Sequence, residues 1–258
     1  MNRIDNLFKS KPRNILSVYF TAGFPALGDT ARILRALQSG GVDMAEIGIP
    51  FSDPMADGPV IQQSSGRALL NGMSLRLLFD QLADIRSEIR IPLVMMGYLN
   101  PIMQYGFEAF CRQCASTGVD GLIIPDLPFA DYLADYRPTA ERYGIRIIML
   151  ITPETSEERI RLIDRHTGGF IYMVSSPSVT GAKSSFDASA QSYFSRIAAM
   201  KLSNPCLVGF GVGNRATSRA ACSHSAGVIV GSRFIHHLQS APSIEEAVGR
   251  LLSDLEWK

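Results

Sequence analysis

Three carboxylates lie close together in the segment EIGIPFSDPMADGP, which spans residues 46–59. Glu46 falls inside an apolar run, whereas Asp53 and Asp57 lie in a proline-rich loop directly after it. A partly desolvated glutamate has a raised pKa and can give and take protons near neutral pH. Two carboxylates in different surroundings can divide the acid and base roles between them. The segment therefore predicts an acid–base site built on Glu46 and Asp57.

The direction of the Glu46 side chain follows from strand alternation. In VDMAEIGI, residues 42–49, Met44, Glu46 and Gly48 share one face, and the residues between them are apolar. Because the outward face of a buried strand packs against helices, Glu46 is expected to point inward. Two other readings stay open: Glu46 could be a structural carboxylate held by an arginine or by hydroxyl groups, and Asp57 could be solvated or cap the next helix.

Eight short apolar runs, rich in valine and isoleucine, alternate with helical patterns along the chain. Such runs are typical of parallel strands that are buried on both faces. Eight strand–helix units in this length predict an α/β fold, a closed (β/α)8 TIM barrel in one domain over residues 1–258. An open, doubly wound sheet is the alternative. The predicted strands are 15–20, 42–49, 91–98, 121–126, 145–152, 169–174, 205–211 and 226–231.

Three segments stand apart from the repeated units. The opening MNRIDNLFKSK predicts an extra N-terminal helix with Ile4, Leu7 and Phe8 on one face. Residues 50–73 and 175–188 are unusually long strand-to-helix connections. Barrel active sites lie at the C-terminal ends of the strands, and long loops in compact domains are often functional. We therefore expect the site to lie beneath these two connections.

Glycines gather after the seventh and eighth predicted strands, in VGFGVG and IVGS. Barrels often bind phosphate there, through backbone N–H groups and the N-terminus of a short helix. Candidate phosphate ligands are therefore the backbones of Gly209, Gly211 and Gly213 and the segment Gly231-Ser232, although the glycines could simply form tight turns. Arg215 and Arg233 lie nearby, and either could equally be a solvated helix charge.

The composition argues against several kinds of partner. A net charge of +1 and a pI of about 7.7 leave no basic excess for nucleic acid or an anionic membrane. No apolar run approaches the roughly 18 residues of a membrane span, and the opening lacks the apolar core of a secretory signal. The four cysteines suit a reducing compartment as free thiols. We expect a cytoplasmic protein.

Cysteine, lysine and histidine do not suggest metal or imine chemistry. Cys111 and Cys114 form a C-x-x-C, but they share the apolar face of a predicted helix, and no second pair completes a zinc set. No lysine lies in a predicted strand, which argues against a Schiff base. The pair His236-His237 is expected at a solvated helix end. Carbon–carbon cleavage would then need a substrate that supplies its own electron sink.

Motifs along the whole chain together resemble those of the tryptophan synthase alpha subunit family. The signature EIGIPFSDPMADGP is accompanied by FTAGFP (20–25), MGYLNPIMQYG (96–106), GLIIPDLP (121–128), SVTGA (178–182), VGFGV (208–212) and IVGS (229–232). The resemblance implies a (β/α)8 barrel and a lyase of tryptophan biosynthesis. The implied reaction is retro-aldol cleavage of indole-3-glycerol phosphate to indole and glyceraldehyde 3-phosphate, with the indole ring as the electron sink.

The resemblance also implies a role for individual residues. Glu46 corresponds to the general acid/base that protonates indole C3 and helps remove the glycerol hydroxyl proton. Asp57 corresponds to the carboxylate that binds the indole N–H, and Tyr172 to a tyrosine beside the substrate. The implied substrate contacts are Tyr19, Ile151, Phe210 and Thr180, the last of which closes onto Asp57. The implied phosphate cradle is Gly181, Gly211, Gly231 and Ser232.

The resemblance further implies a beta-subunit partner that binds pyridoxal phosphate and condenses indole with L-serine, in an alpha2beta2 heterotetramer. The chain itself would hold no metal or cofactor, and Asp53 and its loop would face the partner. Pro177 and Ser178 depart from the G-V-T-G pattern of many members and should stiffen their loop. The rival functions are a non-catalytic regulatory subunit of the beta partner and an unrelated sugar-phosphate isomerase.

Overall fold

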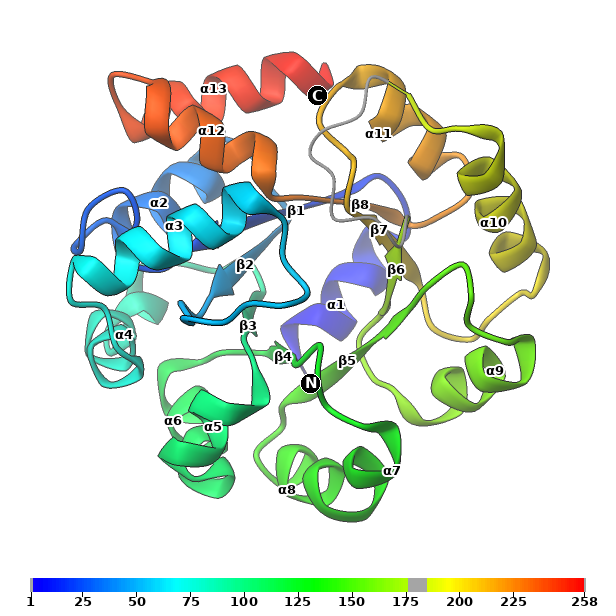
Figure 1. Cartoon of the computed structure of the whole chain (residues 1–258), viewed down its shortest axis with the longest axis horizontal. Helices are drawn as coiled ribbons and strands as arrows, with labels where there is room; N and C mark the ends of the chain where they lie inside the picture. Colours follow the sequence, from blue (N-terminus) through cyan, green and yellow to red (C-terminus); the bar gives the residue numbers. More distant parts are fainter. Residues whose placement is uncertain (1, 176–184, 258) are drawn as a thin grey trace.

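A computed structural model describes residues 2–175 and 185–257. Within that part, eight parallel strands pair in sequence order, and β8 pairs with β1 to close a barrel (Figure 1). This closure confirms the predicted TIM barrel and excludes the open sheet. The strands are β1 (Ile15–Thr21), β2 (Met44–Gly48), β3 (Leu93–Met96), β4 (Gly121–Ile123), β5 (Arg146–Ile151), β6 (Ile171–Val174), β7 (Cys206–Gly209) and β8 (Gly227–Val230).

The first helix lies across one end of the barrel, and the other helices surround the barrel and cover the outer face of the strands (Figure 1). Their bounds are α1 (Arg3–Ser10), α2 (Thr30–Ser39), α3 (Pro59–Leu70), α4 (Leu75–Leu82), α5 (Leu99–Tyr105), α6 (Phe107–Thr117), α7 (Phe129–Asp131), α8 (Arg137–Arg142), α9 (Glu157–His166), α10 (Ala188–Ala199), α11 (Arg215–Cys222), α12 (Ser232–Ser240) and α13 (Ile244–Leu255). The short segments η1 (Ile85–Ser87) and η2 (Tyr132–Tyr136) complete the set.

Strand alternation sorts the apolar side chains into two clusters. An inner cluster fills the barrel and contains Met44, Val94 and Phe170. An outer cluster lies between strands and helices and contains Ala45 and Ile47, the neighbours of Glu46. Successive residues of a strand point to opposite faces, so the inward direction predicted for Glu46 is confirmed.

The predicted N-terminal helix is also confirmed. Asn2 caps α1 by accepting a hydrogen bond from the Ile4 amide, at 2.9 Å. Ile4 is fully buried in the inner cluster, and Leu7 and Phe8 pack against it. Burying this apolar face is what holds so short a helix in place, because isolated helices of this length are marginal in water.

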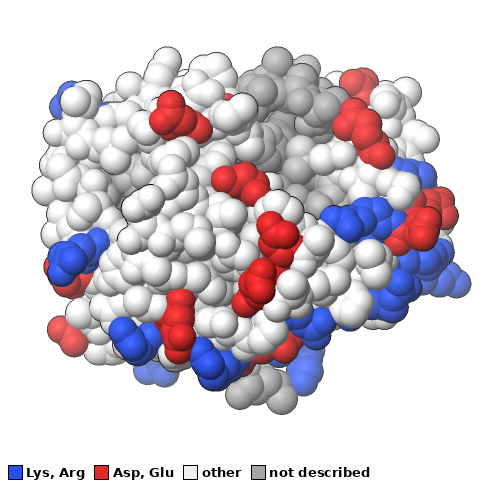
Figure 2. All heavy atoms as spheres, turned by 60° about the horizontal axis from the view of Figure 1, so that its bottom comes forward, with Lys and Arg blue, Asp and Glu red and all other residues white. Residues whose placement is uncertain are grey.

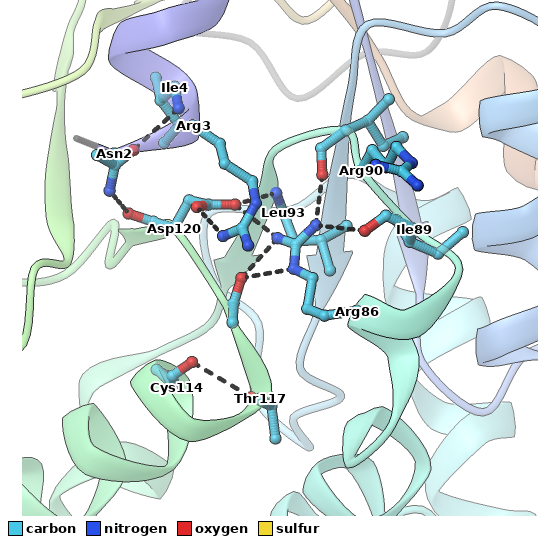
Figure 3. A network of polar contacts seen from close by, with 12 residues as sticks. Asn2, Arg3, Ile4, Arg86, Ile89, Arg90, Leu93, Cys114, Thr117 and Asp120 are labelled. Atoms are coloured by element: carbon cyan, nitrogen blue, oxygen red, sulfur yellow. Dashed lines mark hydrogen bonds and ion pairs between the residues drawn. The ribbon is translucent and has the colours of Figure 1, made fainter.

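A buried polar network ties α1 to the N-terminal ends of the strands (Figure 3). Asp120, just before β4, accepts hydrogen bonds from Arg3, Arg86 and the backbone amide of Leu93. Arg86 also donates to the carbonyl oxygens of Gly118, Ile89 and Ile91. The Nε and both terminal nitrogens of the Arg86 guanidinium group therefore all donate to protein acceptors. This network lies at the N-terminal ends of the strands.

Two sequence-based expectations need correction. The connection at 50–73 is not one long loop, because α3 occupies Pro59–Leu70. The buried face of α3 includes Ser64 and Ser65 as well as Ile61, so no apolar stripe marks it in the sequence. His237 is not solvated: it is 8% exposed, and its Nε2 lies 2.6 Å from Asp254 of α13.

Candidate active site

Glu46 is completely buried inside the barrel. The register pairs it with Tyr19 of β1 on one side and Val94 of β3 on the other. Its Oε1 accepts a hydrogen bond of 2.8 Å from the hydroxyl of Ser17, and its Oε2 has no hydrogen-bond partner in the described chain. Burial raises the pKa of Glu46 from its ordinary 4.5 to about 8, against the opposing effect of the Ser17 hydrogen bond. The carboxyl group is therefore protonated at neutral pH and able to act as an acid.

Asp57 is the second buried carboxyl group, with 9% of its surface exposed. The hydroxyl of Tyr98 donates a hydrogen bond of 2.9 Å to its Oδ2. Burial raises the pKa of Asp57 from 3.8 to about 6, and the Tyr98 hydrogen bond works in the opposite direction. Asp57 is therefore mostly ionised at neutral pH, while Glu46 is mostly neutral. The two carboxyl groups have the separated pKa values that acid and base roles require.

The loop that carries Asp57 is fastened at both ends. At its start, Ser65 of α3 bonds both the amide and the carbonyl of Phe51, whose ring stacks on Tyr98. At its end, the Asp57 carbonyl accepts a hydrogen bond from Gln62. Gly58 is the N-cap of α3 and Pro59 its first residue, a position that suits proline. These contacts hold Asp57 over the barrel rather than in solvent.

Two glycines make room for two tyrosines inside the barrel mouth. A β-carbon at Gly48 would lie 2.1 Å from the hydroxyl oxygen of Tyr19, and one at Gly209 would lie 2.1 Å from that of Tyr172. Burial first, and then the nearby carboxylates, raise the pKa of both tyrosines, so both hydroxyls remain neutral. The expected inward direction of Tyr172 is confirmed, because it packs with the inner cluster.

A cavity of about 170 Å³ opens between these groups and the turns after β7 and β8. Its lining residues come from the loop after β2, from the inner faces of β1, β3 and β6, and from the turns after β7 and β8. Among the predicted residues, the cavity is lined by Tyr19, Asp57, Tyr172, Phe210, Gly211, Gly231 and Ser232. Glu46 contributes no surface to the cavity, but it is the register partner of Tyr19, one of the two lining tyrosines.

Helix α12 begins at one edge of this cavity. Gly231 is its N-cap and Ser232 its first residue, and among the described residues no side chain caps this helix end. Gly211 has a φ of 71°, a left-handed conformation that favours glycine. Helix N-termini attract anions through their unpaired N–H groups and the helix dipole. Arg215 and Arg233, in contrast, pair with Glu256 and Asp254 on the outer helices.

The structure does not bring every predicted residue to the cavity. Ile151 is fully buried in the outer cluster, because Ile148 and Leu150 take the inward positions of β5. Asp53 is exposed, next to Met55, which is 89% exposed. Thr180 and Gly181, like Pro177 and Ser178, lie outside the described residues.

Two residues of the site were not predicted. Ser17 holds the carboxyl group of Glu46, and Tyr98 holds that of Asp57. The sequence predicts both residues only as parts of strands. Alternation could have identified Ser17, since it places this polar residue on the inward face between Ile15 and Tyr19. Tyr98 left no such signal, because its contact with Asp57 spans 41 residues of sequence.

Three further observations concern metal ligands, membrane-spanning helices and surface charge in the described chain. Within residues 2–175 and 185–257, no group of three or more His, Cys, Asp and Glu side chains is placed to hold a metal ion. In the same ranges, no helix has both the length and the apolarity needed to cross a membrane. Figure 2 shows acidic and basic side chains interspersed on one face of the molecule, around a surface that is mostly uncharged.

A TIM barrel with two buried carboxyl groups at the C-terminal ends of its strands, near the N-terminus of α12, has the architecture of a barrel enzyme. The family model described as tryptophan synthase alpha chain matches residues 6–256. The chain therefore belongs to the tryptophan synthase alpha chain family.

Individual relatives agree with this assignment. The tryptophan synthase alpha chain of Parabacteroides distasonis is 63% identical over 256 residues, which cover 99% of this chain and 100% of that one. That of Phocaeicola vulgatus is 61% identical over 257 residues, with coverage of 99% and 100%. The crystal structure of tryptophan synthase subunit alpha from Legionella pneumophila str. Paris has a TM-score of 0.88 at 33% identity and covers 99% of this chain and 97% of that one.

Proposed function

We propose that this chain is the alpha subunit of tryptophan synthase and cleaves indole-3-glycerol phosphate into indole and glyceraldehyde 3-phosphate. Family membership makes it a lyase of tryptophan biosynthesis. The observation that carries the reaction is a pair of buried carboxyl groups: Asp57 lines the cavity, and Glu46 lies behind its wall beside Tyr19. Burial raises the pKa of Glu46 to about 8 and that of Asp57 to about 6, which favours a neutral Glu46 and an ionised Asp57. A retro-aldol cleavage needs both states at once.

The chemistry follows from these two protonation states. Glu46 donates its proton to C3 of the indole ring, which places positive charge on the ring nitrogen. The Asp57 carboxylate accepts a hydrogen bond from that N–H and stabilises the developing charge. Glu46, now a carboxylate, takes the proton of the glycerol hydroxyl next to the ring. The carbon–carbon bond breaks, its electrons return to the ring, and indole and the aldehyde leave with Glu46 protonated again.

The phosphate group is assigned to the other edge of the cavity. The N-terminus of α12 at Gly231 and Ser232 and the backbone of Gly211 support this assignment, because they line the cavity and a helix N-terminus offers N–H donors and a dipole to an anion. Gly181 joins this cradle by resemblance alone. Tyr172 and Phe210, whose ring centroids are 6.2 Å apart, supply an aromatic wall beside the place where the indole ring would lie.

The partner is assigned to the surface of the loop after β2. Asp53 and Met55 are exposed there, and an exposed methionine beside a charge is suited to a protein interface. We propose that a beta subunit binds this surface in an alpha2beta2 heterotetramer in the cytoplasm. The beta subunit holds pyridoxal phosphate and condenses the released indole with L-serine.

Indole release by the purified chain tests this function. The chain alone is expected to release indole slowly from indole-3-glycerol phosphate, and faster when a beta subunit is added. Glu46→Gln and Asp57→Asn should each lower kcat by about a hundredfold or more, because each removes a proton-transfer or charge-stabilising group. Full activity in both variants would overturn the assignment. Binding without turnover in the wild-type chain would favour a regulatory subunit instead.

A further inference from the structure

Ser17 is a polar residue in a place where the barrel interior is otherwise apolar. It is completely buried, and alternation along β1 puts it on the inward face between Ile15 and Tyr19. In the register of the sheet it lies beside Met44 of β2, two positions before Glu46. Buried hydroxyl groups almost always have a hydrogen-bond partner. The partner of Ser17 is Oε1 of Glu46, at 2.8 Å.

The two oxygen atoms of Glu46 are thereby made unequal. Oε1 is held by Ser17, whereas Oε2 is buried with no hydrogen-bond partner in the described chain. A buried carboxyl oxygen without a partner is costly, so such an atom calls for an explanation. Tyr19, which lines the cavity, is the neighbour of Glu46 in the register of β1 and β2, and both point into the barrel, so the Glu46 carboxyl group lies behind the cavity wall.

A serine hydroxyl has a single hydrogen to donate. It donates this hydrogen to Oε1 when Glu46 is a carboxylate, and it can keep donating it when Glu46 is neutral, provided that the acid proton sits on Oε2. The same hydrogen bond then persists while Oε2 gains and loses its proton. We propose that Ser17 is a positioning residue for Glu46: by occupying Oε1, it reserves Oε2 for proton transfer to and from the substrate. This inference rests on the proposed function.

The pH dependence of the Glu46 carboxyl group tests this directly. A hydrogen bond to a carboxylate is stronger than one to a neutral carboxyl, so Ser17→Ala should raise the titration midpoint of Glu46 by about one pH unit. The midpoint is measured by NMR of protein labelled with carbon-13 at glutamate carboxyls, with Glu46→Gln identifying the signal. Ser17→Thr keeps the hydroxyl and should restore the wild-type midpoint. Ser17→Cys, a weaker donor of similar size, should give an intermediate value.

Catalysis supplies the second readout. In Ser17→Ala, the alkaline limb of the kcat/KM profile should move to higher pH with the Glu46 midpoint. In the same variant, kcat at the optimum should fall about tenfold, because the carboxyl group loses its fixed orientation. KM should stay nearly constant, since Ser17 is fully buried and does not line the cavity.

Ser225→Ala is the matched control. Ser225 is also a buried serine beside a strand, but its hydroxyl lies 2.9 Å from two carbonyl oxygens, those of Ala221 in α11 and Gly227 at the start of β8, and can donate to either. This variant should leave both the Glu46 midpoint and the pH profile unchanged. An unchanged midpoint and an unchanged alkaline limb in Ser17→Ala would overturn the inference and leave the proposed function intact. Absence of indole release in the wild-type chain would instead contradict the proposed function, while the NMR titration would still decide the role of Ser17.

Discussion

Tyr98, just after β3, holds Asp57 over the barrel from the end of the strand next to β2. Its hydroxyl donates to Oδ2 of Asp57 and accepts a hydrogen bond from the backbone amide of Ala56, both at 2.9 Å. Tyr98 is itself fixed just before α5, where the amide of Leu99 donates to Asp126. One phenol group therefore sets both the place of the Asp57 loop and the charge state of its carboxyl group.

Removing this hydroxyl should move the acid limb of the pH profile. The Tyr98 hydrogen bond lowers the pKa of Asp57, which burial raises to about 6. Tyr98→Phe should therefore raise that pKa further, by about one unit. Because Asp57 acts as the anion, the acid limb of kcat/KM for indole release should shift to higher pH, with the largest loss of rate below pH 6.5 or so.

Tyr105→Phe is the matched control for Tyr98→Phe. Tyr105 ends α5 and packs against Phe79 and Phe110 through its ring. Loss of its hydroxyl should leave the acid limb where it is. If the two variants shift the limb equally, the effect does not come from the contact between Tyr98 and Asp57.

The buried Glu46 should make stability depend on pH. Its pKa rises from 4.5 to about 8 on folding, so the folded state binds the proton more tightly than the unfolded state. Stability from this group is complete below pH 4.5 and declines as pH rises toward 8. Over that range the loss is roughly 3–5 kcal/mol, at about 1.4 kcal/mol per pKa unit.

Glu46→Gln removes this titration while keeping the shape of the side chain. Urea unfolding measures the free energy of unfolding at pH 5 and pH 8. Between these pH values, the unfolding free energy of Glu46→Gln should rise relative to that of the wild type. Other titrating groups cancel in the comparison, because they are present in both proteins. A difference in unfolding free energy that is the same at both pH values would mean that Glu46 titrates normally in the folded chain.

The sequence predicted those parts of the fold and site that follow from local periodicity. Buried parallel strands alternate strictly, so the inward direction of Glu46 and Tyr172 could be worked out from single strands. The same rule, applied to β5, separates Leu150 from Ile151 and would have placed Ile151 outside the cavity. The predicted substrate contact of Ile151 rested on the family resemblance alone, which does not record the face of the strand on which a residue lies.

Other features depend on contacts that no local pattern records. Helix α3 was missed because its buried face is partly polar: Ser64 bonds Thr21, and Ser65 bonds Phe51. Each serine hydroxyl is satisfied by a distant partner, so the face can be buried without being apolar. The contact between Tyr98 and Asp57 is of the same kind, since its two residues meet only once β3 has paired with β2.

The glycine at 209 should be required for the shape of the site. A β-carbon there would lie 2.1 Å from the hydroxyl oxygen of Tyr172 and 2.4 Å from the ring carbon that bears it. Gly209→Ala should therefore displace Tyr172, destabilise the chain by about 1–3 kcal/mol and lower kcat/KM for indole release. Gly249→Ala is the control: this helical glycine has open space around it, so alanine should stabilise the chain by about 0.5–1 kcal/mol. Wild-type kcat/KM in Gly209→Ala would show that the tyrosine can move without cost to the reaction.

The Arg86 network should matter for stability and not for chemistry. Asp120 is 4% exposed and shares Arg86 and Arg3 as ionic partners at the N-terminal ends of the strands, away from the cavity. Arg86→Met would leave Asp120 with Arg3 as its one ionic partner among the described residues, and would remove the guanidinium donor from the carbonyl oxygens of Gly118, Ile89 and Ile91. Because breaking one side of a buried ion pair leaves the other charge poorly compensated, the variant should lose about 2–4 kcal/mol of unfolding free energy.

Arg90→Met, at an exposed position four residues along, should change the unfolding free energy by no more than about 0.5 kcal/mol. Urea unfolding of both variants measures the difference. At a temperature where Arg86→Met stays folded, its kcat for indole release should match that of the wild type, because the cavity lies at the other end of the barrel. A loss of kcat in folded Arg86→Met, or equal stability of the two variants, would contradict a purely structural role for this network.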